Sequence, residues 1–554
     1  MLLNKLAVAC GTLWLCSAPV ALAQSPSLAQ FAFPPLAESR PPRLPQHHAK
    51  VGPLEALQEK EHTEPLRNLQ VHHPPVVPVG GSSCVVELLR HDFAFSYYEP
   101  AIANFTPPTD CGVPGSWAAV VLSLTVTSNG TQFDRLASFS LDHVEIWRTS
   151  TAEPTRNGII WTYEKDVSRF APLFAKPGQL VFELDNVITE RYTGIFSTIL
   201  SATFYEPTPD FPAPSRADLI LPVTTSASNS SQMLSYPGDA SANVTVPVNT
   251  AEAWLEVLAT GAAEEEFWYT NVLDRWKDHW PEARLIGKGP YREVQIRIDG
   301  VLGDLTDGAG HNISFSVYGQ GKGGSVNSNW FLTGALHIVL DPTAPPVRTT
   351  GRQLIYEVTP EPFIISAGFP STDALKTVVE GQRSVNIVSE LETGSGKKVV
   401  HWGQAATVEN QQNYADDGAY ETVAHTTNMR TTSVYPSHLN FRDVYTFTLS
   451  LTTNYTLMSQ GRFSAELADY TYNRALTLPP ALGGGQPSLT KSTQKGSAAV
   501  LGRVGNFSLG RGETEEMYLY KGARGETYWE KTRAVNATIA SRKMGGSLAQ
   551  RGDR

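Results

Sequence analysis

The apolar and polar positions of this chain alternate in short runs and do not follow a helical period. From Ser82 onward, runs of Val, Ile, Leu, Phe, Tyr and Thr are separated by Gly, Pro, Asn and Asp, which is typical of strands joined by turns. The runs at 118–126, 139–147, 180–184 and 195–204 predict the strands of a β-sandwich or jelly roll. We therefore expect an all-β fold.

Two proline clusters divide the predicted strands into three groups. The first contains prolines at 207, 209, 212 and 214, and the second spans 342–346; proline excludes central strands. We expect a first jelly-roll domain over 81–206, an adjacent second one over 217–341 and a C-terminal β region over 347–545. Further strands are predicted at 242–260, 291–298, 313–317, 330–340, 353–358, 384–390 and 444–453.

The N-terminus has the pattern of a secretory signal. Lys5 precedes an apolar run over 6–22, and Ala21-Leu22-Ala23 supplies the small residues of a cleavage site, so residues 1–23 are expected to be a signal peptide. The run is interrupted and shorter than the ~20 residues of a membrane span. Residues 24–80 are rich in Pro, His, Gln and Glu and predict a disordered linker or propeptide. We expect a secreted protein without a membrane association after cleavage.

Charge and histidine spacing exclude several kinds of partner. The net charge is −10 and basic residues do not cluster, which argues against nucleic acid. The pairs His47-His48 and His72-His73 lack the spacing of metal ligands, so no metal and no other cofactor is predicted.

The cysteines and sequons agree with secretion. Removal of the signal peptide leaves Cys84 and Cys111 of four cysteines, and an even pair in an oxidising compartment predicts one disulfide. Glycosylation sequons point to a eukaryotic source and to exposed positions. They occur at Asn104, Asn129, Asn229, Asn243, Asn312, Asn454, Asn506 and Asn536.

Charged residues between apolar strand positions must be paired, exposed or functional. Asp134-Arg135 enters a predicted strand, either as a turn ion pair or as a carboxylate that activates water beside a guanidinium that holds a polar substrate. Glu266 runs into Phe267-Trp268-Tyr269, which suits a sugar ring, although core aromatics beside an acidic loop give the same pattern. Asp185 and Arg292 lie at strand ends.

Several segments of the chain resemble the acid-type peptide N-glycanases of fungi and plants. They are Gly-Thr-Gln-Phe-Asp-Arg at 130–135, Trp-Arg-Thr-Ser-Thr-Ala-Glu-Pro at 147–154, and the segments 157–163, 192–194, 266–269 and 289–294. The resemblance implies an amidase without a metal that acts on N-linked glycopeptides or glycoproteins. Such an enzyme releases the glycan as its glycosylamine and leaves Asp in place of Asn.

A more distant resemblance, to the bacterial peptide N-glycosidase, implies two adjacent jelly rolls with the active site at their interface. It suggests that Asp134 activates or orients the attacking water, and that Glu266 orders a bridging water and binds the chitobiose core. Substrate contacts are expected from Arg135, Arg148, Asp185, Trp268 and Arg292.

The chain departs from the family after Gly303. Family members normally continue through several tens of residues rich in Pro, Gly and Trp, whereas this chain passes directly to Leu305-Thr306-Asp307-Gly308. A shortened second domain is therefore expected. The alternatives are a noncatalytic carbohydrate-binding β protein or inactive family member, and a glycoside hydrolase that leaves one sugar on the asparagine.

Overall fold

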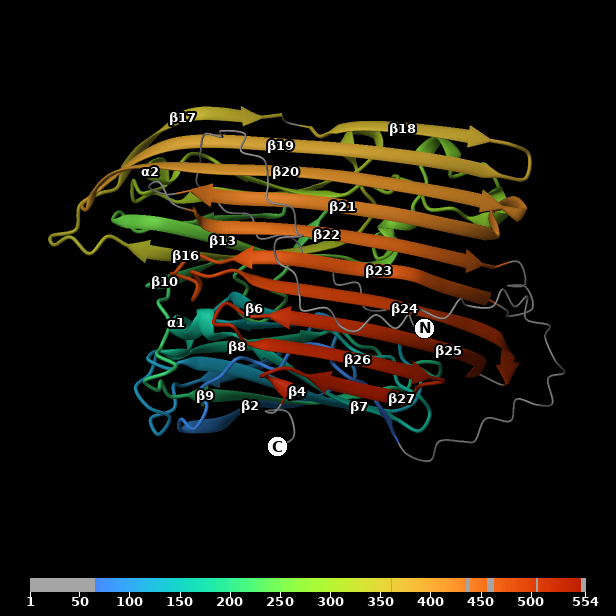
Figure 1. Cartoon of the computed structure of the whole chain (residues 1–554), viewed down its shortest axis with the longest axis horizontal. Helices are drawn as coiled ribbons and strands as arrows, with labels where there is room; N and C mark the ends of the chain where they lie inside the picture. The colour runs from blue at the N-terminus through green and yellow to red at the C-terminus, as the bar shows by residue number, and fades with distance from the viewer. Residues whose placement is uncertain (1–64, 360, 435–438, 456–462, 505–506, 550–554) are drawn as a thin grey trace.

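The computed structural model describes residues 65–359, 361–434, 439–455, 463–504 and 507–549, which form five β-sheets and a few short helices (Figure 1). The expected all-β class is confirmed. The predicted signal peptide and most of the predicted linker lie outside the described residues. None of the helices in the described ranges has the length and hydrophobicity to span a bilayer.

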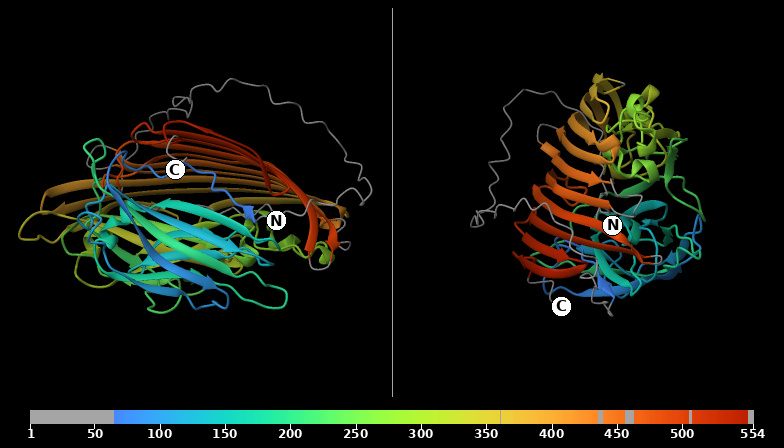
Figure 2. Two further views of the ribbon diagram at one scale, coloured as in Figure 1. Left: turned by 90° about the horizontal axis from the view of Figure 1, so that it is seen from below. Right: turned by 90° about the vertical axis from the view of Figure 1, so that its right-hand side faces the viewer.

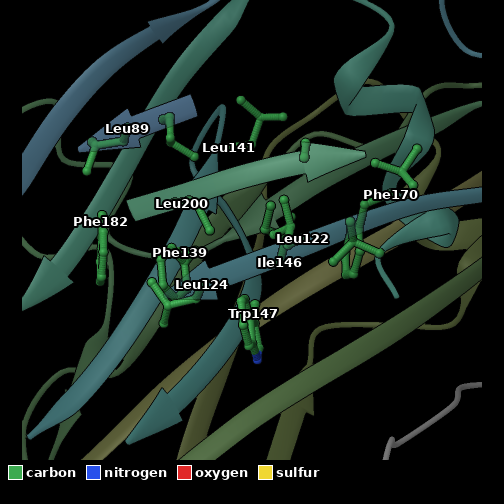
Figure 3. Packing of buried hydrophobic residues seen from close by; sticks show 14 of the residues in the cluster. Leu89, Leu122, Leu124, Phe139, Leu141, Ile146, Trp147, Phe170, Phe182 and Leu200 are labelled. Atoms are coloured by element: carbon green, nitrogen blue, oxygen red, sulfur yellow. The ribbon is translucent and has the colours of Figure 1, made fainter. Parts of the chain in front are cut away.

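Two sheets pack face to face in the first unit. One has the order β1 (Leu66–Arg67), β7 (Ile159–Asp166), β4 (Ala119–Ser128), β9 (Phe196–Tyr205) and β2 (Ser83–Phe93). The other has the order β3 (Ala101–Phe105), β8 (Gly178–Leu184), β5 (Leu136–Leu141) and β6 (Val144–Ser150). Every second residue of β9 is buried, which is the period of a strand with one face on a core. Phe139, Trp147 and Phe182 meet β4 and β9 residues in that core (Figure 3).

The single strand predicted over 139–147 is a hairpin in the structure. Asp142 and His143, both with positive φ, form its two-residue turn between β5 and β6. Two consecutive left-handed residues make the turn that suits the twist of paired strands. Neither residue is glycine, so the sequence did not mark the turn.

The last part of the predicted linker packs against the folded chain. Leu66 and Arg67 pair in parallel with Ile159 and Ile160. The ring of His73 stacks on Tyr520 at 3.7 Å between centroids. Residues 65–80 therefore do not behave as the free linker that the composition predicted.

The second unit also has two sheets. One joins β13 (Thr250–Gly261) to β16 (Trp330–Leu340), whose other edge carries β10 (Leu219–Val223) and β11 (Leu234–Tyr236). The other has the order β12 (Ser241–Val244), β15 (His311–Tyr318) and β14 (Glu293–Ile298). The strand predicted over 242–260 is thus two strands in different sheets, separated by a segment that contains Pro247.

The helical segments within the described residues are all short. They are η3 (Ser168–Phe170), α1 (Ala171–Phe174), η4 (Ala263–Glu265), η5 (Trp268–Thr270), η6 (Asp274–Trp276), η7 (Pro281–Ala283), α2 (Leu302–Leu305), η8 (Lys322–Gly324) and η9 (Asp416–Gly418). Helix α2 lies where the chain is expected from its sequence to depart from the family, after Gly303. Leu302 and Leu305 are buried in the core of the second unit, and the hydroxyl of Thr306 donates to the backbone oxygen of Thr349 at 2.6 Å. The junction is therefore closed by a packed turn.

One antiparallel sheet of 11 strands forms the C-terminal part and covers one side of both preceding units (Figure 2). Its strands are β17 (Thr350–Val358), β18 (Phe363–Pro370), β19 (Leu375–Thr393), β20 (Gly396–Ala415), β21 (Tyr420–Val434), β22 (Leu439–Asn454), β23 (Phe463–Thr477), β24 (Ser488–Val504), β25 (Phe507–Lys521), β26 (Thr527–Val535) and β27 (Thr538–Gly545). Trp402 and Phe441 pack against Trp254 of the second unit.

The predicted disulfide joins Cys84 of β2 to Cys111, which lies in the loop between β3 and β4. Of the sequon asparagines, Asn104, Asn129, Asn229, Asn243, Asn312 and Asn536 are exposed and Asn454 is half-buried. Asn506 lies outside the described residues. Glycosylation of these positions and the three domain bounds stay predictions.

Candidate active site

The ends of three neighbouring strands bring polar residues to one edge of the first unit. Asp134 and Arg135 precede β5, whose Ala137 pairs with Leu184 near the end of β8. Asp185 therefore follows β8 at the same edge. Glu153 lies three residues beyond the end of β6, where Ser150 pairs with Leu136.

Arg135 acts electrostatically on two carboxyl groups at this edge, those of Asp134 and Asp185. Its Nη2 donates to Oε1 of Gln132 at 2.6 Å, while its Nε is buried without a hydrogen-bond partner among the described residues. Burial raises the pKa of Asp134 and of Asp185, and the charge of Arg135 acts in the opposite direction on both pKa values. Asp185 also accepts a hydrogen bond from the backbone N–H of Tyr98 at 3.1 Å.

Glu266 enters the same site from the second unit. It follows η4, immediately after β13. Partial burial, and then the negative charges of Asp134 and Glu153, raise the pKa of Glu266 to about 7. Glu266 of the second unit therefore lies within electrostatic range of two carboxyl groups of the first unit.

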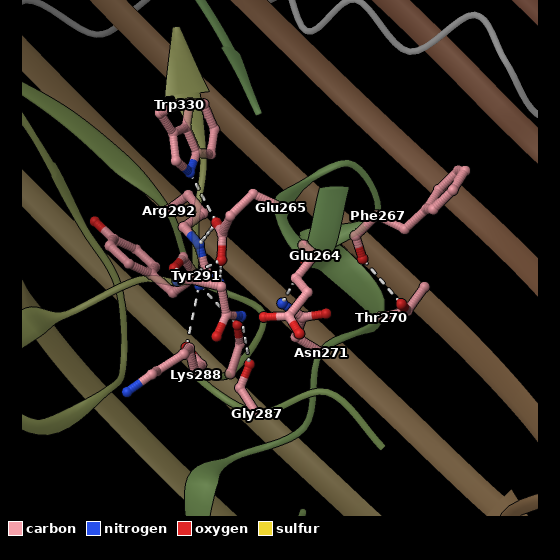
Figure 4. Close-up of polar contacts among 12 residues, drawn as sticks. Glu264, Glu265, Phe267, Thr270, Asn271, Gly287, Lys288, Tyr291, Arg292 and Trp330 are labelled. Carbon is pink, nitrogen blue, oxygen red and sulfur yellow. Dashed lines mark hydrogen bonds and ion pairs between the residues drawn. The ribbon is translucent and has the colours of Figure 1, made fainter. Parts of the chain in front are cut away.

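Glu265, the residue before Glu266, makes a buried ion pair with Arg292 (Figure 4). Its oxygens accept hydrogen bonds from Nε and Nη2 of Arg292 at 2.5 and 2.8 Å, from the indole N–H of Trp330 at 2.8 Å and from the backbone N–H of Asn327 at 2.8 Å. Burial opposes ionisation of Glu265, but the bonds from Arg292 and the others outweigh it and lower its pKa. This network fixes the loop that carries Glu266.

Arg292 is not placed as an exposed substrate contact. Its side chain is 2% exposed, and its Nη1 donates to the backbone oxygens of Lys288, Gly289 and Tyr291 at 3.1, 2.7 and 2.7 Å. The guanidinium is therefore committed to Glu265 and to the backbone. In this structure the geometry differs from the expectation that Arg292 holds the substrate.

Arg148 is likewise engaged inside the protein. It forms a bidentate pair with Glu145 at 2.7 and 2.6 Å and donates to Thr260 and to the backbone oxygen of Phe331 at 3.0 and 2.8 Å. Because Thr260 and Phe331 belong to β13 and β16, this ion pair joins the first unit to the second. Arg148 therefore holds together the two units between which the carboxyl groups meet.

Trp268 packs inward from the loop of Glu266. Its ring meets His425 of β21 edge to face, at 5.4 Å between centroids. The next residue, Tyr269, has its backbone oxygen bonded by the amides of Asn410 and Gln412 at 2.9 and 3.1 Å. The C-terminal sheet thus supports the Glu266 loop from behind.

Glu145, Glu153 and Glu265 were not predicted as site residues, although Glu153 lies in the 147–154 segment that carries the family resemblance and Glu265 precedes Glu266. Glu145 and Arg148 are three residues apart in a strand, which normally places two side chains on opposite faces. An irregularity in the β5–β6 pairing leaves Ile146 without a partner and lets both contact one another. The sequence did contain a signal for this pair, because Glu145 and Arg148 are charged residues within or next to a run of apolar residues.

The chain matches two family models and a curated relative. Residues 74–304 match the family described as peptide N-acetyl-beta-D-glucosaminyl asparaginase amidase A, and residues 376–449 match the PNGase A C-terminal domain. The first match ends at the junction that α2 closes. The chain is 34% identical over 263 residues to the peptide-N4-(N-acetyl-beta-glucosaminyl)asparagine amidase A of Prunus dulcis. That alignment covers 43% of this chain and 44% of the Prunus protein, so the chain spans less than half the length of this relative. On these matches, the chain belongs to the peptide N-glycanase A family.

Proposed function

We propose that this protein is an amidase that hydrolyses the glycan-bearing side-chain amide of asparagine in N-linked glycopeptides or glycoproteins. The observation that carries the proposal is that Asp134 of the first unit lies within electrostatic range of Glu266 of the second, whose pKa is raised to about 7 by burial and by this charge and that of Glu153. Two carboxyl groups with different proton affinities are suited to general base and general acid roles.

In the proposed reaction, Asp134 accepts a proton from the water that attacks the amide carbon. The C–N bond then breaks, and the leaving nitrogen takes up a proton as the glycosylamine departs. Glu266, protonated at mildly acidic pH, is the donor of that proton, and it orders the water that bridges to the sugar. The peptide keeps a new carboxylate, so that Asn becomes Asp.

The remaining site residues have supporting roles in this proposal. Arg135, whose Nε has no internal partner, stabilises the negative charge that develops on the amide oxygen. Asp185 contributes a negative charge that interacts with the guanidinium of Arg135. Arg148, Arg292 and Trp268 position the two units and the Glu266 loop through the contacts described above.

Secretion is part of the same proposal. The disulfide between Cys84 and Cys111 is of the kind that forms in oxidising compartments, and six sequon asparagines are exposed. The predicted substrates, N-linked glycoproteins, occur in the same pathway. No three His, Cys, Asp or Glu side chains gather in metal-binding geometry within the described residues, and no step above uses a metal.

The test is mass spectrometry of a denatured glycopeptide after incubation with the purified protein at mildly acidic pH. The expected product is a peptide with Asp at the former glycosylation site, together with the intact glycan. Release of a glycan that leaves one sugar on Asn would instead identify a glycoside hydrolase. Binding of the glycopeptide without any release would identify a noncatalytic carbohydrate-binding protein, the alternative that the shortened second domain favours.

A further inference from the structure

Two pairs of aromatic rings, three of them exposed and that of Tyr192 half-buried, lie at the edge of the first unit that carries Asp134. Tyr97 and Tyr98 have exposed fractions of 46% and 76%, and Phe133 has 49%. The ring of Phe133 lies 5.2 Å from that of Tyr192, and Tyr97 lies 6.0 Å from Tyr98. We call these four residues the aromatic rim.

The turn that carries Tyr97 and Tyr98 is held in place by hydrogen bonds. The hydroxyl of Ser96 donates to the backbone oxygen of Leu184 at 2.7 Å, and the backbone N–H of Ser96 donates to Asn186 at 3.0 Å. The N–H of Tyr98 donates to Asp185, and Tyr98 has a φ of 59°. A bulky residue in this left-handed conformation is uncommon and persists only where its surroundings fix it.

The second pair is fixed in the same way. The backbone N–H groups of Thr193 and Gly194 both donate to the oxygen of Thr131, at 2.8 and 3.0 Å. The guanidinium of Arg191 lies 5.3 Å from the centre of the Tyr192 ring. Tyr97, Tyr98 and Phe133 therefore present exposed rings on a backbone that is held in place. Exposed apolar groups that gather at one place mark candidate binding surfaces.

The rim is continuous with the carboxylate site. Phe133 adjoins Asp134 in the sequence, and Tyr98 is bonded to Asp185, whose pKa responds to Arg135. The polar groups and the exposed rings thus lie along one edge, with Glu266 facing Asp134 from the second unit.

We propose that the aromatic rim binds sugar rings of the glycan, as the carbohydrate-side part of the substrate site. This inference rests on the proposed function for its substrate class. A sugar ring has an apolar C–H face and a border of hydroxyl groups. The rim offers aromatic faces beside the carboxylate of Asp185 and the guanidinium of Arg191, which can bond those hydroxyls.

An extended peptide suits this surface less well. A peptide that adds to a sheet needs unpaired backbone groups. The backbone N–H groups of Ser96, Tyr98, Thr193 and Gly194 are already bonded within the protein, as described. A ligand at the rim would therefore be bound by side chains, and the aromatic side chains can bind it by stacking on a sugar ring.

The test uses binding of the free trimannosyl-chitobiose pentasaccharide, which has no amide to hydrolyse, measured by calorimetry or by ligand-observed NMR. Tyr98→Asn keeps a residue that tolerates the left-handed conformation, and Phe133→Ala removes a ring from the other pair. Each variant is expected to weaken binding about fivefold to tenfold, since about 1 kcal/mol per stacked ring corresponds to that range. Phe363→Ala, which removes an exposed ring on β18, is the matched control and should bind as the unchanged protein does.

The same variants are assayed for hydrolysis of a glycopeptide and of the same peptide with a single GlcNAc. We expect a higher KM for the full glycan and little change for the single sugar. Unchanged pentasaccharide binding by the folded rim variants would overturn the inference, even if hydrolysis is observed. Reduced binding of the unglycosylated peptide would also overturn it in favour of a peptide site. If the unchanged protein binds the pentasaccharide but has no amidase activity, and the rim variants lose that binding, the proposed function is refuted and the rim remains a glycan-binding surface.

Discussion

Glu265 accepts hydrogen bonds from Nε and Nη2 of Arg292, at 2.5 and 2.8 Å, and both side chains are shielded from water. The adjacent residue, Glu266, has its pKa raised by burial and by Asp134 and Glu153 on the other unit. Two neighbouring glutamates of one loop therefore have different roles. One fixes the loop to the second unit, and the other reaches the candidate active site.

Removal of Glu265 is expected to destabilise the protein. Glu265→Ala leaves the guanidinium of Arg292 buried without its counter-ion, a change that typically costs about 3–5 kcal/mol in the free energy of unfolding. Chemical denaturation of the variant and the unchanged protein measures this difference. The control is Arg352→Ala, which breaks an exposed pair with Glu390 and should cost less than about 1 kcal/mol. Equal small losses in both variants would contradict the structural role of the Glu265–Arg292 pair.

Asp134→Asn should abolish hydrolysis and leave the fold intact. The amide cannot accept the proton of the attacking water, and loss of a general base typically lowers a rate by about 10²–10⁴. The initial rate of conversion of Asn to Asp in a glycopeptide measures the effect, with a circular dichroism spectrum to verify folding. Asp278→Asn, at an exposed carboxylate 4.0 Å from Lys277, is the control and should keep full activity. An active Asp134→Asn variant would remove this residue from the mechanism.

The pH profile should report the protonation of Glu266. Because its pKa is about 7, the protonated form is lost as the pH rises through that value, so kcat/KM should fall on the alkaline side. Glu153→Gln removes a negative charge that raises this pKa, and the alkaline limb should therefore move to lower pH. Glu266→Gln should lower the maximal rate and eliminate that limb. An alkaline limb that is the same in all three proteins would assign it to another group.

The strand pattern was readable where strands are regular. The predictions of 118–126, 195–204 and 330–340 agree within two residues with β4, β9 and β16, because one face of each strand is apolar and turn residues bound it. The long strands of the C-terminal sheet were predicted only in part, for example 384–390 within β19. Their exposed faces carry Thr, Glu and Gln, which interrupt the apolar period that the prediction relies on.

The candidate site was predictable in its residues and less so in its geometry. Asp134 and Glu266 were found through a family resemblance, and their meeting depends on the packing of two units, which no local pattern encodes. No local pattern predicts the partner of Arg292 either, because this partner is Glu265, the residue before Glu266. Because neighbouring side chains of a 3-10 turn point in different directions, the sequence alone does not predict which of Glu264, Glu265 and Glu266 is buried.

A second titratable glutamate lies at the interface of the two units. Glu183 of β8 is buried, and its Oε1 accepts the backbone N–H of Gln232 at 2.6 Å. Burial raises its pKa to about 7, helped by the charges of Glu145 and Asp185 and opposed by the bonds from Gln232 and Ser231. Folding therefore favours the protonated form of this group.

The free energy of unfolding should consequently fall as the pH rises. Between the unfolded pKa of 4.5 and the folded pKa of about 7, the folded state binds more protons at Glu183 than the unfolded state does. The stabilisation is complete below that window and is lost as the pH passes through 7, by up to about 3 kcal/mol for this group. Glu183→Gln stays uncharged and can still accept the bond from Gln232. Urea unfolding at pH 5 and pH 8 measures how much the free energy of unfolding decreases between the two pH values. This decrease should be smaller in Glu183→Gln than in the unchanged protein. The control Glu190→Gln, at an exposed position, should show the same decrease as the unchanged protein. If both variants lose as much stability as the unchanged protein, the pH dependence arises elsewhere and Glu183 is already ionised in the folded state.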